Sequence, residues 1–146
     1  MICSIIIPTF NRKEVLKNNL MFLSRQKNID NDFEVLIVDD GSTDGTGELI
    51  EEIKGDFPFA LRYFNTSLTD VNGVSVARNT GIKEAVCNKL IFIDDDMSVY
   101  PYFVAAHLDA LKNNLVVQGH ISHKAEKLND IPPVSVEDGT AKRFMK

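Results

Sequence analysis

The sequence has little cysteine and histidine. Its 146 residues include only Cys3, Cys87 and three histidines, with no CxxC pair and no histidine cluster at ligand spacing. A disulfide framework needs more cysteines, and a zinc site needs closely spaced cysteine or histidine ligands. We therefore expect neither, and we expect the chain to work in a reducing cytoplasm.

Basic stripes and long apolar runs are also lacking. The formal net charge is −5 and the 16 Lys and Arg residues are scattered, which argues against nucleic acid as the main partner. The first apolar run ends at Pro8 and is too short for a signal peptide or a membrane span. We predict no membrane span in this chain, while membrane association through other regions of a longer protein stays open.

Common phosphate-binding motifs are missing as well. The sequence has no GxxxxGK(S/T) and no GxGxxG after its first strand-like run, which argues against P-loop and Rossmann dinucleotide-binding proteins. A phosphorylated receiver domain would need a Lys directly after its last strand, and none is found there.

What the sequence does have is a regular alternation of strand-like and helical patterns. The strand-like runs occupy residues 3–8, 34–39, 60–64, 89–94 and 115–118. The helical patterns occupy 46–53, 76–85 and 101–112, after a first helix with Asn11 as N-cap and Glu14 three residues later. Continuous apolar runs indicate strands covered on both faces. We predict an α/β fold with an open, mostly parallel, doubly wound sheet over residues 1–121, followed by an irregular tail at 122–146.

Polar residues follow three of the strand-like runs directly, and a fourth polar segment lies in the connection after the third run. The four segments are Thr9-Phe10-Asn11, Asp39-Asp40-Gly41-Ser42, Arg78-Asn79 and Asp94-Asp95-Asp96. In open α/β sheets, ligands bind outside the carboxyl ends of the strands. We therefore expect these four segments to converge on one edge of the sheet and to form a binding site there.

The three consecutive aspartates indicate a cation site. Adjacent carboxylates repel one another and resist desolvation unless a cation or a donor compensates them. In an extended segment Asp94 and Asp96 share a side, so both can face one hard cation while Asp95 points elsewhere. Mg²⁺ or Mn²⁺ suits oxygen ligands that also hold a diphosphate. The alternative is a solvated acidic turn that caps the next helix.

The loop after the second strand-like run permits a rival interpretation. Residues at positions 1, 3, 5, 6 and 12 of an EF-hand loop correspond to Asp40, Ser42, Asp44, Gly45 and Glu51. An EF-hand needs a helix before its loop, whereas residues 35–38 are predicted to form a buried strand. A third possibility is a structural Asx-turn and helix cap.

Two further side chains are candidates for nucleotide contacts. With Ser75 as N-cap, Arg78 lies in the first turn of its helix, where an anion such as diphosphate would offset the unfavourable dipole. The alternative is a surface Arg paired with a carboxylate. Phe10 can stack on a nucleobase, although an aromatic after a strand more often packs in the core. Asp39 or Asp40 can accept a hydrogen bond from a base imide or a ribose hydroxyl.

Four segments together resemble the family 2 glycosyltransferases of the GT-A fold, whose nucleotide-binding half is Rossmann-like. They are residues 4–12 (SIIIPTFNR), 35–46 (VLIVDDGSTDGT), 77–82 (ARNTGI) and 91–96 (IFIDDD). Their order and spacing also match, and the similarity covers about residues 2–121.

The resemblance implies an inverting transfer from a UDP-, GDP- or dTDP-sugar with Mg²⁺ or Mn²⁺ at the DxD-like aspartates. Base and ribose would lie near Pro8, Thr9, Phe10, Asp39 and Asp40, and Arg78 would approach the diphosphate. By the family pattern Asp96 would bind the metal directly, and Asp94 or Asp95 would contact the ribose or the donor sugar. The acceptor, whether carbohydrate, lipid or protein, is not indicated.

One family feature is not found in its usual place. Full-length members have an acceptor-binding half after the DxD segment, with a carboxylate base often in a Glu-Asp pair. Here Glu137-Asp138 follows too soon after Asp96, and a polar turn before Gly139 is the better interpretation of this pair. The catalytic base is therefore unassigned.

Two other functions stay open beside a glycosyltransferase. A noncatalytic nucleotide-binding module that keeps only the donor half is the alternative, and a calcium-binding structural module is a third hypothesis.

Overall fold

The computed structural model describes residues 1–66, 73–111 and 116–119. The elements in chain order are β1 (Ser4–Thr9), α1 (Lys13–Leu23), β2 (Glu34–Asp39), α2 (Thr46–Ile53), the 3₁₀ turn η1 (Lys54–Asp56), β3 (Ala60–Asn65), α3 (Val74–Glu84), β4 (Leu90–Phe92) and α4 (Phe103–Ala110). This alternation confirms the predicted α/β class. Within the described residues, no helix is long and apolar enough to span a membrane.

The described strands form one parallel sheet in the order β3-β2-β1-β4. Every residue of β1 and β2 is buried, which explains why the residues between their polar ends are continuously apolar rather than alternating. In the register between β1 and β2, Ser4 pairs with Glu34 and Thr9 pairs with Asp39. The carboxyl ends of these two central strands are therefore level with each other.

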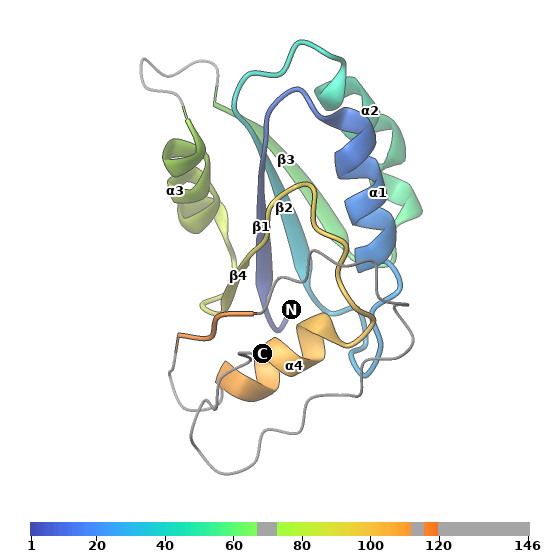
Figure 1. Ribbon diagram of the computed structural model, residues 1–146, viewed down its shortest axis with the longest axis vertical. Helices are drawn as coiled ribbons and strands as arrows, with labels where there is room; N and C mark the ends of the chain where they lie inside the picture. Colours follow the sequence, from blue (N-terminus) through green and yellow to red (C-terminus); the bar gives the residue numbers. More distant parts are fainter. Residues whose placement is uncertain (67–72, 112–115, 120–146) are drawn as a thin grey trace.

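Helices cover both faces of the sheet (Figure 1). On one face the α1 leucines Leu16, Leu20 and Leu23 pack in the cluster that contains Ile5 and Ile7 of β1. Full burial of each such side chain contributes about 1.5 to 3 kcal/mol.

On the opposite face α3 packs against β1 and β2. Ala77 of α3 joins Ile6 and Val38 in a smaller apolar cluster. Gly81 lies so close to β1 that a Cβ atom there would overlap the Ile6 side chain. Because Gly81 has no side chain, α3 approaches the sheet closely and its first turns are fixed beside the carboxyl end of β1.

The predicted strand at 115–118 is wrong for residues 116–118, which the structure describes. Residues 116–119 form no strand, and Val116 is 96% exposed. A short apolar run becomes a strand only where a sheet edge accepts it, and here the run has no such neighbour in the described structure. Leu115 lies outside the described residues, as do residues 122–146 with Glu137 and Asp138. The division of the chain at residue 121 stays a prediction.

Three predicted helix starts also need correction. The N-cap position of α1 is Arg12 rather than Asn11, and that of α3 is Gly73 rather than Ser75. Gly73 has a φ of 121°, a conformation that favours glycine, and this lets the chain turn directly into α3. α4 begins at Phe103, two residues after the Pro101 expected to start it.

Candidate functional site

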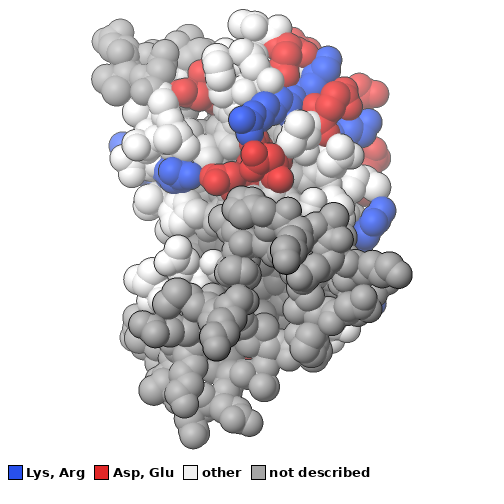
Figure 2. Space-filling view, in the orientation of Figure 1, with Lys and Arg blue, Asp and Glu red and all other residues white. Residues whose placement is uncertain are grey.

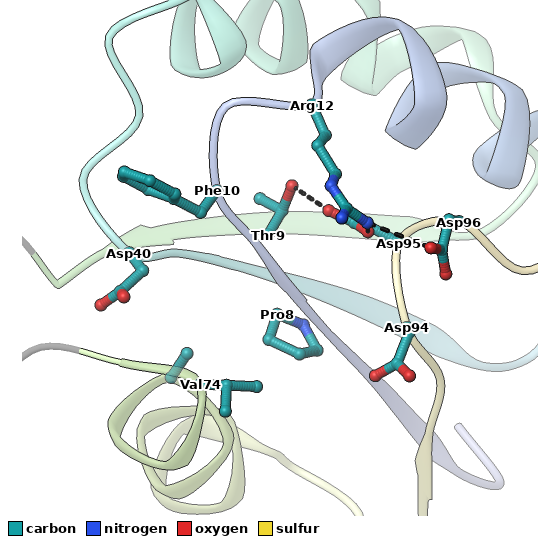
Figure 3. Close-up of a pocket in the computed structure, with 10 residues that line it drawn as sticks. Pro8, Thr9, Phe10, Arg12, Asp40, Val74, Asp94, Asp95 and Asp96 are labelled. Carbon is teal, nitrogen blue, oxygen red and sulfur yellow. Dashed lines mark hydrogen bonds and ion pairs between the residues drawn. The ribbon is translucent and has the colours of Figure 1, made fainter.

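A cavity of about 370 Å³ lies at the carboxyl ends of β1, β2 and β4, beside the start of α3 (Figure 3). Its lining residues come from four segments that are far apart in the sequence. They are Pro8, Thr9, Phe10, Arg12, Asp40, Val74, Ala77, Asp94, Asp95 and Asp96. Seven of the nine residues singled out from the sequence are among them. The remaining two do not line the cavity: Arg78 bonds to the lining residue Asp94, and Asp39 directly precedes the lining residue Asp40 in the chain.

The three aspartates after β4 differ in environment. Asp95 is only 5% exposed, and its Oδ2 accepts a hydrogen bond of 2.8 Å from the Thr9 hydroxyl. Asp94 and Asp96 are exposed, with more than half of each side chain accessible to solvent. Asp95 therefore ties the end of β4 to the end of β1, and the other two carboxylates are accessible from the cavity.

Arg12 is a site residue that we did not predict. Its Nη1 lies 3.2 Å from Asp95 Oδ1 and 3.1 Å from Asp96 Oδ2, so one nitrogen bridges two carboxylates (Figure 3). The attraction of Asp95, and then its hydrogen bond, raise the pKa of the Arg12 guanidinium. The available signal was the position of Arg12, directly after the strand-end residues Thr9-Phe10-Asn11.

Arg78 lies two residues further into its helix than expected, because the N-cap is Gly73 rather than Ser75. Because α3 begins at Val74, Arg78 is beyond the first turn, and the argument from the helix dipole is wrong. Its Nη2 lies 2.9 Å from Asp94 Oδ1, which is the carboxylate pairing weighed as the alternative. This pairing places Arg78 at the edge of the acidic turn, so that contact with a diphosphate stays a prediction.

Asp39 is fully buried at the end of β2. Its Oδ1 accepts bonds from the Ser42 amide (2.8 Å) and hydroxyl (2.6 Å), and its Oδ2 accepts a 2.7 Å bond from the Tyr63 hydroxyl. Burial, followed by the bond to Asp39, raises the pKa of the Tyr63 hydroxyl. The three bonds shape the loop after β2, and a contact of Asp39 with a nucleobase stays a prediction.

Asp40 links the sheet to the start of α3. Its Oδ1 accepts a 2.9 Å bond from the Gly73 amide and a 3.2 Å bond from the Thr66 hydroxyl. Asp40 is partly exposed on the cavity wall, opposite the acidic turn in Figure 3. It can therefore accept a further hydrogen bond from a ligand while it holds the entry to α3.

The loop between β2 and α2 is organised by Asp44 and Asn11. Asp44 Oδ2 accepts from the Lys13 amide at 3.0 Å, and its Oδ1 accepts from the Thr46 amide at 3.1 Å and hydroxyl at 2.6 Å. Asn11, at a φ of 52°, accepts from the Thr43 amide at 2.8 Å. Asp44 thus caps α1 and α2 together, and Asn11 joins the loops after β1 and β2.

These contacts disfavour the EF-hand interpretation. A strand, β2, precedes the loop where an EF-hand has a helix. Gly47 stands at an apolar EF-hand position, and a Cβ atom there would lie only 3.0 Å from the Tyr63 hydroxyl oxygen, which leaves little room for an apolar side chain. Asp44 uses both of its carboxylate oxygens as helix caps rather than as free cation ligands.

Acidic and basic side chains meet at this edge of the sheet. Figure 2 shows acidic groups near the middle of the face, with basic groups next to them. In the described part of the chain, no three His, Cys, Asp or Glu side chains are grouped to hold a metal ion by themselves. Mg²⁺ is commonly bound by one or two carboxylates together with substrate phosphates and water. The exposed pair Asp94 and Asp96 fits that mode, and it does not fit a site made of protein ligands alone.

Comparison with known proteins agrees with this arrangement. Residues 4–145 match the sequence profile of the family Glycosyl transferase family 2. The chain belongs to this family. Solved structures of the GT-A type share its fold, which confirms the resemblance seen in the four sequence segments.

The matched relatives are much longer than this chain. The uncharacterized glycosyltransferase YfnE of Bacillus subtilis is 40% identical over 118 residues, which are 80% of this chain and 29% of YfnE. Chondroitin synthase of Escherichia coli is 36% identical over 109 residues, which are 74% of this chain and 15% of the synthase. This family 2 chain therefore spans less than a third of either relative.

Two solved structures of nucleotide complexes are similar to the chain. S. aureus TarS 1-349 in complex with UDP has a TM-score of 0.64 and 27% identity, covering 75% of this chain and 32% of that chain. The mannosyltransferase PcManGT of Pyrobaculum calidifontis, in complex with GDP-Man and Mn²⁺, has a TM-score of 0.63 and 25% identity. That match covers 74% of this chain and 30% of PcManGT.

Proposed function

We propose that the cavity binds a nucleotide diphosphate sugar and that the chain is the donor-binding part of an inverting glycosyltransferase. The observation that carries this proposal is the convergence of residues from β1, β2, α3 and the turn after β4 on one cavity. Membership of family 2 supports it, as do the similar structures that hold UDP, UDP-GlcNAc or GDP-Man. The acceptor is a carbohydrate, a lipid or a protein.

The nucleoside would occupy the side of the cavity formed by the loops after β1 and β2. Phe10 is 54% exposed although it is a large apolar residue, and it lines the cavity. An exposed aromatic at a cavity wall is suited to stack on a base. Pro8 and Thr9 form the neighbouring wall, Asp40 is placed to accept from ribose or base, and Asp39 holds this loop from beneath.

The diphosphate would lie toward the acidic turn. Asp96 and Asp94 would hold Mg²⁺ or Mn²⁺, whose positive charge would stabilise the departing diphosphate when bound. Arg78 presents a forked guanidinium at the same edge, and such a donor suits phosphate oxygens. Asp95 keeps the turn attached to β1 through Thr9, which fixes the direction in which its two neighbours face.

Thermal unfolding with UDP, GDP or dTDP, each with and without Mn²⁺, tests the donor site. A ligand at about 100 times its dissociation constant adds roughly 2.7 kcal/mol, which raises the midpoint by about 5 to 10 °C at this size. We expect one nucleotide to give a Mn²⁺-dependent shift that Asp96→Asn removes. Asp56→Asn, which changes an exposed carboxylate after α2, should leave the shift intact. If no nucleotide shifts the midpoint, the donor site is not formed in this chain.

A noncatalytic nucleotide-binding module is the second candidate. It is favoured by the cavity, because none of the described residues that line it has been assigned to take the acceptor's proton. Release of free sugar from the bound donor, or its transfer to an added acceptor, would exclude this candidate. Binding without either reaction would support it.

A further inference from the structure

The acidic turn after β4 already has its own counter-charges. Arg12 contacts Asp95 and Asp96, and Arg78 contacts Asp94. Three carboxylates and two guanidinium groups leave one formal negative charge on the turn. A divalent cation that arrives alone therefore meets a site whose charge is mostly neutralised.

Both the backbone and the side chain of Arg12 are positioned by neighbouring groups. Its backbone is at the N-cap position of α1, next to Lys13, whose amide donates to Asp44. Of its two partners, Asp95 is anchored by Thr9 and its side chain is 7% exposed, whereas the Asp96 side chain is 54% exposed. Arg12 thus has one fixed partner and one partner that is open to exchange.

We infer that Arg12 competes with the divalent cation for Asp96, so that metal and nucleotide diphosphate bind cooperatively. The inference rests on the proposed function, which makes Asp96 a metal ligand. A cation that takes Asp96 leaves the Arg12 guanidinium short of one partner, at a cavity wall where phosphate oxygens would supply another. By linkage, the nucleotide then raises the affinity for the metal as much as the metal raises the affinity for the nucleotide. Arg12 would therefore make the site discriminate between the metal alone, which it disfavours, and the metal together with a nucleotide diphosphate.

The direct test is the affinity for Mn²⁺ in the absence of nucleotide, measured by electron paramagnetic resonance of the free ion. Arg12→Gln removes the competing charge and both ion pairs. Partly exposed ion pairs contribute modestly, so the expected gain is about threefold to tenfold in Mn²⁺ affinity. Arg25→Gln is the matched control, because it removes the same charge from an exposed position beyond α1 and should leave the affinity unchanged.

Cooperativity gives the second readout. In the unmodified chain, Mn²⁺ should bind more tightly with UDP, GDP or dTDP present, after correction for the complex that ion and nucleotide form in solution. In Arg12→Gln the ratio of Mn²⁺ affinities with and without nucleotide should be smaller. The decrease should be at least as large as the factor by which this substitution raises the affinity for Mn²⁺ alone. Circular dichroism verifies folding, and Arg12→Met, which keeps the aliphatic length without the charge, repeats the test if the Gln variant unfolds.

The outcomes separate this inference from the proposed function. If Asp96→Asn removes Mn²⁺ binding but Arg12→Gln and the unmodified chain bind Mn²⁺ equally, the competition by Arg12 is refuted and the metal site stands. Mn²⁺ binding that does not need Asp96, or no binding to any variant, overturns the metal assignment and the inference with it. Tighter binding in Arg12→Gln that depends on Asp96 supports both.

Discussion

Asp44 is predicted to stabilise two helices at once. Its two carboxylate oxygens accept from the first amide of α1, at Lys13, and from the first amide of α2, at Thr46. Both amides belong to the first turns of helices, where no intrahelical partner exists for them. Asp44→Ala should therefore lose two helix caps, at helices that flank the cavity loops.

The expected loss follows from the known value of such caps. One cap contributes about 1 kcal/mol, so Asp44→Ala should lower the free energy of unfolding by about 2 kcal/mol and the thermal midpoint by about 4 to 8 °C. Asp44→Asn keeps one acceptor oxygen and should lose about half as much. Glu52→Ala, at an exposed position of α2, controls for the lost charge. Urea unfolding followed by circular dichroism measures all three variants.

The effect of Asp44 should also depend on pH with a definite sign. Burial by itself would raise the pKa of Asp44, but hydrogen bonds from Thr46 and from the Lys13 backbone outweigh it and hold the pKa below the ordinary 3.8. As the pH falls, Asp44 therefore takes up its proton in the unfolded state before it does so in the folded state. The stabilisation is fully present above the pKa of the unfolded state and is lost as the pH falls through the pKa of the folded state. The stability difference between the unmodified chain and Asp44→Asn should be constant from about pH 5 to 7 and shrink below about pH 4. A difference under about 0.5 kcal/mol at pH 7, or one that grows in acid, would refute the double cap.

Three further outcomes are expected. Gly81→Val should destabilise the chain by about 2 to 3 kcal/mol, because its side chain overlaps β1, while Gly55→Ala, with open space around it, should not; equal urea midpoints would contradict this. Tyr63→Phe removes a donor from the buried carboxylate at the end of β2 and should cost about 1 to 2 kcal/mol in the same assay, whereas an unchanged stability would show that water replaces the hydroxyl. A thiol reagent should modify the half-buried Cys87 in the folded chain but Cys3 only after unfolding, since burial raises the pKa of Cys3 to about 12; two fast thiols would contradict the buried position.

The parts of the fold that were predictable are those determined by local patterns. The expected strand 34–39 and helix 46–53 have the bounds that the structure shows for β2 and α2. An apolar run covered on both faces and a helix with a strong apolar stripe carry their signal within a few residues. The fifth expected strand had a similar run, but a strand also needs a neighbouring edge, and sequence periodicity does not show whether one is available.

Helix starts were less predictable because their caps come from distant residues. The capping-box pattern at Asn11 was plausible locally, yet the amide at the start of α1 bonds to Asp44, 31 residues further along the chain. Asn11 instead accepts from Thr43 of the same distant loop. A sequence pattern indicates only capping residues that are near in the sequence. It does not indicate a distant hydrogen-bond acceptor that the fold brings to the start of the helix.

The same reasoning explains why the sequence predicted the location of the site but not the ion pairs within it. Parallel strands end at one edge whatever their order, so the convergence of the strand-end residues followed from the α/β class alone. The pairing of Arg12 with Asp95 and Asp96 needed one more fact, namely that β4 lies directly beside β1 in the order β3-β2-β1-β4. That neighbour relation brings residues 83 and 84 positions apart into contact. It also divides the acidic turn into one carboxylate that holds two strands together and two that can exchange partners, and this division determines which aspartate to mutate first.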